Sequence, residues 1–331
     1  MIWALGQAEP RWCSPGPAWY IASMLVTGVD ENGLGPRLGP LVATALSLEL
    51  PRYSRAALCQ RGLRLGLTDS KETGGFGRMG FTESVALGLL SLSPELRAPR
   101  TADELLRRLR ADPERRLRPH CPDDATASQC WGVDLALPAF GGDPELGREL
   151  IRRLVGRSQL RIADVQSRVA CAGVLNAKLA EGKNKLAVDL ELFEDLIDHS
   201  RAEPEASRLV VCGMIGGIRD YGTRFERFTP QRARPLPGRR GQRRYAVDGL
   251  GELRFEIDAD ARHLPVALAS IVGKYVREVC MHRIGEFYRL DVPGLKLASG
   301  YHDPVTTRFI EATEPSRRGR GIAESCFRRR A

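Results

Sequence analysis

Two adjacent carboxylates, Asp30 and Glu31, are the side chains of this sequence whose types and position most readily do chemistry. They follow residues 24–29 (MLVTGV), an apolar run that predicts a buried strand, so both stand where a strand ends near the edge of a sheet. Neighbouring residues of a strand face opposite sides of the sheet. One carboxylate therefore points into a site, and the other needs a bend or a bulge to join it.

The segment after the acidic pair, residues 32–40 (NGLGPRLGP), is dense in glycine and proline. Such a stretch predicts a tight connection to the next strand. Its glycines let the backbone pass close to a ligand, and its N–H groups can then contact phosphate or sugar oxygens. The acidic pair and this loop together are the strongest candidate for a functional site.

The elements that must position this site are strands alternating with helices, which predicts an α/β fold. Further strands are expected at residues 40–50, 130–138, 208–213 and 251–258. Helices are expected at residues 82–92, 101–110, 143–155, 185–200 and 266–288. Thr101 and Glu104 fit a capping box. Residues 111–128 predict a polar surface insertion, and residues 231–244 a basic loop.

The composition predicts a globular chain with a sizeable core, because 43% of its 331 residues are hydrophobic. Lys and Arg outnumber Asp and Glu by 50 to 41, and this net charge of +9 favours a polyanionic partner as much as it fits a basic protein without one. The eight cysteines form no CxxC pair, which is typical of a reduced, cytoplasmic protein. No apolar run reaches the roughly 18 residues of a membrane helix.

The chain divides into three expected parts. Residues 1–23, rich in proline and glycine, predict a poorly ordered N-terminal extension, and Met24 is an alternative start. Residues 24–310 predict one domain with an insertion at about residues 80–160. Residues 311–331 predict a basic C-terminal tail.

The opening segment resembles the motif G-x-D-E-x-G-R-G-P-x-x-G-P of the ribonuclease HII family. The matching residues are Gly28, Asp30, Glu31, Gly33, Gly35, Pro36, Gly39 and Pro40. Asp69-Ser70-Lys71 resembles the D-S-K that follows the second strand of that family, and Ser299-Gly300-Tyr301 resembles its K-G-Y. Asp260, ten residues before Ser270, resembles the last catalytic Asp. The helix motif after it, P-x-x-x-A-S-I-x-x-K-x-x-R-[DE], is matched by Pro265, Ala269, Ser270, Ile271, Lys274, Arg277 and Glu278.

The resemblance spans about residues 24–80 and 160–310 and implies a ribonuclease H-like α/β fold, with a mixed central sheet flanked by helices. It implies a metal-dependent endoribonuclease that cleaves RNA in RNA–DNA hybrids, or ribonucleotides in DNA, with two Mg²⁺ or Mn²⁺ held by carboxylates. Asp30, Glu31 and Asp260 are the expected catalytic residues and metal ligands, with Asp258 as an alternative ligand. The expected contacts with nucleic acid come from Gly33, Gly35, Lys71, Ser270, Lys274 and Tyr301.

Two departures from the family pattern leave alternatives open. The family's third acid ends a strand in a pattern like V-V-x-D, but this chain has no carboxylate at Gly213, and Asp220 lies seven residues further on. The arginine of the G-R-G triplet, which helps the family recognise a 2′-hydroxyl, is Leu34 here. The alternatives are a non-catalytic nucleic-acid-binding protein on the same fold and a nuclease with another substrate, such as structured DNA.

Overall fold

A computed structural model describes residues 23–67, 79–92, 97–111, 121, 129–156, 159–200 and 207–330. The expected N-terminal extension up to residue 22, the Asp69-Ser70-Lys71 motif and most of the expected surface insertion lie outside these residues. The division of the chain into an extension, a domain and a tail stays a prediction.

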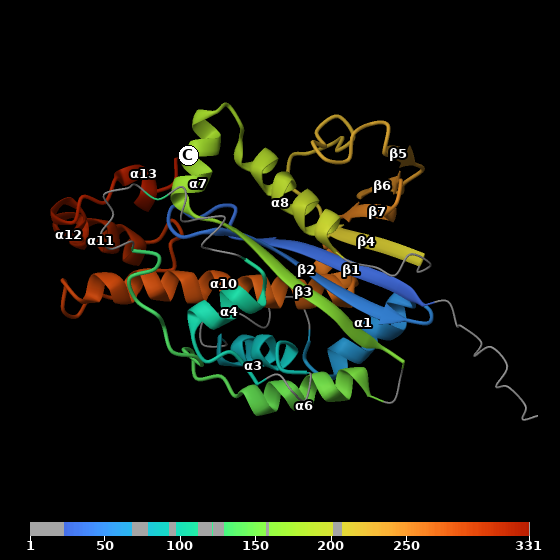
Figure 1. The fold of residues 1–331 in the computed structure, drawn as a ribbon, viewed down its shortest axis with the longest axis horizontal. Helices are drawn as coiled ribbons and strands as arrows, with labels where there is room; N and C mark the ends of the chain where they lie inside the picture. The colour runs from blue at the N-terminus through green and yellow to red at the C-terminus, as the bar shows by residue number, and fades with distance from the viewer. Residues whose placement is uncertain are drawn as a thin grey trace, which may run out of the picture.

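The described residues form a seven-stranded sheet in the order β3-β2-β1-β4-β7-β6-β5. Its strands are β1 (Met24–Asn32), β2 (Leu41–Leu50), β3 (Arg161–Ala170), β4 (Ser207–Gly213), β5 (Ala233–Leu236), β6 (Gln242–Val247) and β7 (Gly251–Glu256). β4 pairs in parallel with both β1 and β7, and the other pairings are antiparallel. Helices flank the sheet (Figure 1), so the expected α/β fold with a mixed central sheet is confirmed.

The first helices of the described chain are α1 (Arg55–Arg64), α3 (Met79–Leu89), α4 (Ala102–Arg108), α6 (Pro144–Val155), α7 (Ala172–Ala180) and α8 (Lys185–His199). They are followed by α9 (Ala259–Arg262), α10 (Leu264–Arg289), α11 (Pro304–Ala312), α12 (Glu314–Gly319) and α13 (Glu324–Phe327). In the described part of the chain, no helix is both long and apolar enough to cross a membrane.

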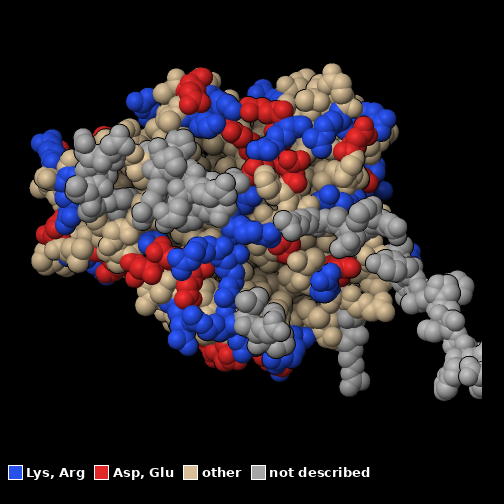
Figure 2. Space-filling model, in the orientation of Figure 1, with Lys and Arg blue, Asp and Glu red and all other residues tan. Residues whose placement is uncertain are grey.

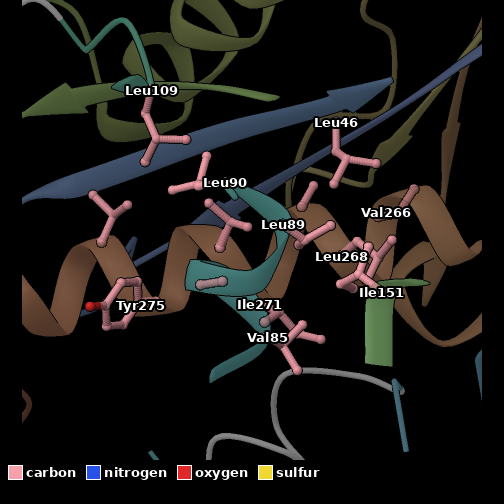
Figure 3. Packing of buried hydrophobic residues seen from close by; sticks show 14 of the residues in the cluster. Leu46, Val85, Leu89, Leu90, Leu109, Ile151, Val266, Leu268, Ile271 and Tyr275 are labelled. Atoms are coloured by element: carbon pink, nitrogen blue, oxygen red, sulfur yellow. The ribbon is translucent and has the colours of Figure 1, made fainter. Parts of the chain in front are cut away.

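The two faces of the sheet are covered by different helices (Figure 1). Because side chains alternate along a strand, Val26 and Val211 pack with α10 on one face, whereas Val29 and Cys212 pack with α8 on the other. Figure 3 shows the first of these cores, in which α10 packs against β2 and α3, and α6 packs against α3. The 26-residue helix α10 is therefore the central support of the sheet.

Two expectations about elements were wrong. Residues 130–138 form no strand and contribute only an isolated bridge between Thr101 and Ala136. The expected basic loop at residues 231–244 contains β5 and the start of β6. Its arginines are exposed or half-buried residues of an edge hairpin, and the hairpin buries Ala233, Tyr245 and Val247. The other expected strands and helices are confirmed, with ends that differ by a few residues.

Glu83 anchors the region between residues 80 and 160 to α10. Its side chain is fully buried in α3 and accepts hydrogen bonds from the backbone N–H groups of Ala139 (2.6 Å), Phe140 (2.8 Å) and Gly142 (2.8 Å). The hydroxyl of Tyr275 in α10 donates a fourth bond at 3.0 Å. These donors satisfy a carboxylate that would otherwise be costly to bury.

Replacing Glu83→Ala leaves these buried donors without their acceptor and is expected to lower the free energy of unfolding by about 3 kcal/mol or more. Urea denaturation of the full chain measures this. Glu145→Ala is the control, because Glu145 is exposed and, among the described residues, forms an ion pair only with Arg148 on its own helix. Its loss should therefore stay within about 0.5 kcal/mol. Equal losses in the two variants would contradict the anchoring role.

Candidate active site

Asp30 is held at the end of β1 by the close packing of β1 on α10. At Gly28, two residues earlier on the same face, a Cβ atom would lie 2.2 Å from the carbonyl carbon of Pro265, so only glycine lets the strand and the helix approach this closely. Asp30 itself is 8% exposed, and the hydroxyl of Ser270 in α10 donates a hydrogen bond to it. Burial raises the pKa of Asp30 well above its ordinary value, and the nearby Glu31 and Asp260 raise it further.

Glu31 and Asp30 meet over Gly213, the last residue of β4. A Cβ atom at Gly213 would lie 2.6 Å from Oδ1 of Asp30 and 3.7 Å from Oε2 of Glu31. The register of β1 with β2 runs without a shift to Asn32, so the expected bulge is absent. Glu31 reaches the site instead because Gly213 carries no side chain. The carboxylates of Asp30 and Glu31 lie in the space that a third acid at position 213 would occupy.

Asp260 enters the site from α9, a single turn between β7 and α10. Its Oδ1 accepts a hydrogen bond from the backbone N–H of Ala261 (3.0 Å), and its charge acts on Asp30. The backbone that leads into this turn is unusual, because Asp258 has a left-handed conformation with φ of 52°. His263 follows the turn and lies between Tyr53 (2.6 Å) and Glu256 (3.2 Å), which fixes the turn to the end of β7.

A cleft of about 700 Å³ brings most of the expected site residues together. It is lined by Asp30, Glu31, Asp258 and Asp260, and by Gly33, Gly35, Ser270, Lys274 and Tyr301. Lys71 lies outside the described residues. Asp220, the alternative acid, is exposed away from the cleft, where it accepts hydrogen bonds from the N–H of Gly222 (2.9 Å) and the hydroxyl of Tyr245 (3.2 Å).

The cleft is acidic, because four carboxylic acids line it and Lys274 is the one basic residue among its described lining residues. Lys274 also bonds to Glu278, one turn along α10, at 2.9 Å. Carboxylates this close repel one another and repel phosphate unless a cation lies between them. Within the described residues, however, no three His, Cys, Asp or Glu side chains already lie close enough to hold a metal ion.

The glycine-rich loop beside the cleft is held by two buried arginines. Gly33 has φ of +93°, and a Cβ atom there would lie 2.7 Å from Nε of Arg277, which also stacks on Tyr301 with its guanidinium 4.8 Å from the ring centre. Arg329, near the C-terminal end, donates to the carbonyl oxygens of Gly33 and Gly39. Burial, and then the charge of Arg277, lower the pKa of Arg329 to about 9.

Sequence reasoning missed Asp189 in α8. Its side chain is fully buried, and neither carboxyl oxygen has a hydrogen-bond partner among the described residues. Burial, followed by the charges of Glu31 and Asp30, raises its pKa well above the ordinary value. The local sequence gives no sign of this burial, because an acidic residue within a predicted helix is normally expected to face solvent.

No protein-family model and no curated protein matches the sequence. The structure is similar to a ribonuclease HII from Archaeoglobus fulgidus, solved in complex with PCNA, at 17% identity over 93% of this chain and 95% of that one, with a TM-score of 0.45.

Two further solved structures are similar over a large share of the chain. The ribonuclease H2 of Pyrococcus horikoshii OT3 is 16% identical, with 92% of each chain covered and a TM-score of 0.45. Bst-RNase HIII in complex with Mn²⁺ is 16% identical over 93% of this chain and 67% of that one, with a TM-score of 0.42.

Arg329→Ala is expected to lower the free energy of unfolding by about 2–4 kcal/mol, because it leaves buried loop carbonyls without donors. Thermal and urea unfolding of the full chain measure the effect. Arg330→Ala removes the same charge at an exposed neighbour and should change stability by less than about 0.5 kcal/mol. An Arg329→Ala protein as stable as Arg330→Ala would show that the loop does not depend on this arginine.

Proposed function

We propose that this protein is a metal-dependent endonuclease of the ribonuclease H type, which hydrolyses RNA in RNA–DNA hybrids or at ribonucleotides embedded in DNA. The observation that carries the proposal is that Asp30, Glu31 and Asp260, the three acids that match the motifs, line one cleft with Ser270 and Lys274. Residues 230 positions apart in the chain would not meet in this way if the motifs had matched by chance.

The acids fit Mg²⁺ or Mn²⁺ in kind, because hard cations take carboxylate oxygens. The fully buried and unpartnered oxygens of Asp189 next to these acids also fit a cation, since nothing else in the described chain neutralises them. The described acids do not form a metal site as they stand, so binding would require their side chains to move together. Asp30, Glu31 and Asp260 would hold the metal, with Asp258 as the alternative ligand. When bound, the metal supplies an activated water and stabilisation of the leaving 3′ oxygen.

Features around the acids support a nucleic-acid substrate. The backbone of Gly33 and Gly35 borders the cleft, where its N–H groups can contact sugar or phosphate. Lys274 supplies a cation for a phosphate, and Tyr301, 42% exposed on the guanidinium of Arg277, offers a ring for stacking.

A second groove continues from Gly35 and supports binding of a longer polyanion. Its volume is about 610 Å³, and Gly35 lines both it and the cleft. Its basic lining residues are Arg37, Lys185, His302, Arg328, Arg329 and Arg330. On the face shown in Figure 2, by contrast, Lys and Arg are scattered among Asp and Glu. The groove is therefore a better candidate for a phosphate track than the overall charge would suggest.

A non-catalytic nucleic-acid-binding protein is the second candidate. It is favoured by the glycine at position 213 and because, among the described residues, no group of three His, Cys, Asp or Glu could hold a metal ion. Under this alternative, the same cleft and groove bind a hybrid without cutting it. A cytoplasmic location stays a prediction for both candidates.

Cleavage of a labelled duplex with a single ribonucleotide, in Mg²⁺ and then in Mn²⁺, tests the proposed activity. The wild-type protein should cut beside the ribonucleotide, and Asp30→Asn should lower the rate by about 100-fold or more, because it removes a carboxylate from the metal site. Asp220→Asn is the matched control, since it makes the same change away from the cleft and should keep the full rate.

Binding of the uncut duplex, followed by fluorescence anisotropy at low salt, separates the two candidates. Tight binding without cleavage in either metal would favour the non-catalytic binding protein over the nuclease. Cutting that persists in Asp30→Asn would contradict the site proposed here.

A further inference from the structure

Asp189 is the exception among the buried acids of α8. Glu194 accepts hydrogen bonds from three backbone N–H groups, those of residues 226, 227 and 228. Asp195 is paired with Arg168 and with Arg227, the latter at 2.8 Å. Asp189 is as deeply buried as either, yet both of its oxygens lack a partner among the described residues. A buried charge without a partner is strongly unfavourable, so such groups point to a missing cation or proton.

The position of Asp189 ties it to the candidate active site. Glu31 lies on the face of the sheet that α8 covers, and the charges that act on Asp189 are those of Glu31 and Asp30. Leu186, one helical turn earlier, would lie 3.2 Å from a Cβ atom at Gly217, which lines the cleft. The first turns of α8 therefore pack against residues that line the cleft.

The glycine at position 213 explains why an acid from α8 has a place here. The end of β4 offers neither a carboxylate nor a side chain that separates Glu31 from Asp30. The neighbouring Cys212 is fully buried on the face of α8, and the charges of Asp30 and Asp189 both act on it. Asp189 therefore lies on the α8 side of the end of β4, where Gly213 replaces the expected third acid.

The structure assigns to Asp189 the role of the missing carboxylate: together with Asp30, Glu31 and Asp260 it completes a site for Mg²⁺ or Mn²⁺, from α8 rather than from β4. This inference rests on the proposed function, because it concerns the same metal site. It explains the two unpartnered oxygens, since a cation in the site supplies the opposite charge that no described residue provides.

Binding of Mn²⁺ alone to the full chain, measured by electron paramagnetic resonance and by calorimetry, tests this role. Asp189→Asn keeps the shape of the side chain and should weaken Mn²⁺ binding by tenfold or more. Asp198→Asn makes the same change on the same helix at an exposed position and should leave Mn²⁺ binding unchanged. Asp189→Ser repeats the measurement with a smaller side chain in case the amide is poorly tolerated.

The unfolding temperature without metal separates a metal ligand from a structural residue. Loss of the repulsion with Glu31 should leave the unfolding temperature of Asp189→Asn equal to that of the wild type or above it, while the rise produced by Mn²⁺ becomes smaller. Mn²⁺ binding by Asp189→Asn and Asp189→Ser as tight as in the wild type would overturn the inference.

Cleavage is not the readout here, so the two proposals fail in different ways. If Mn²⁺ binding depends on Asp189 but the protein cuts no hybrid, the inference is supported and the proposed nuclease activity is contradicted. Cleavage by the wild type, with Mn²⁺ binding that does not depend on Asp189, would overturn the inference alone.

Discussion

Repulsion between carboxylates at the end of β1 is the constraint on which the candidate site depends. Asp30 is buried, and the neighbouring Glu31 and Asp260 raise its pKa further, so the folded chain holds together groups that electrostatics would separate. Asp189 adds a fourth acid to the same neighbourhood from α8. Groups of this kind persist only where the surrounding structure imposes them, which is why they are typical of functional sites.

The surrounding structure imposes this arrangement through close backbone contacts. Gly28 lets β1 lie directly on α10, which fixes Asp30 beside Ser270. Gly213 lets Glu31 reach Asp30 around the end of β4. Arg329 donates hydrogen bonds to carbonyl oxygens of the glycine-rich loop, and Arg277 packs against Gly33. These contacts keep the acids near one another, and the divalent cation proposed above would relieve their repulsion.

Local sequence patterns predicted the part of the site that depends on short-range order. Asp30 and Glu31 were found because a buried strand precedes them, and Asp260 because of its fixed spacing from Ser270. Strands β1, β2, β4 and β7 and the main helices followed from sequence patterns, whereas β3 was not predicted. The hairpin at residues 233–247 was missed because its many arginines concealed a strand whose Tyr245 and Val247 face the core.

Local sequence patterns could not predict contacts between distant parts of the chain. Asp189 reads as an ordinary helix residue, and its burial depends on how α8 packs on the sheet. Arg329 lies in what reads as a basic tail, and only the fold places it under a loop some 290 residues earlier. Both residues matter through tertiary burial, which sequence spacing does not encode.

The most direct test of the central claim is a crystal structure of the full chain grown with Mn²⁺, with the metal located by its anomalous scattering. A carboxylate-bound Mn²⁺ is predicted in the cleft, with oxygens of Asp30, Glu31 and Asp260 at roughly 2.0–2.3 Å. A cleft without Mn²⁺ in saturating metal, or Mn²⁺ bound only at surface acids elsewhere, would contradict the claim that this cluster of acids is a metal site.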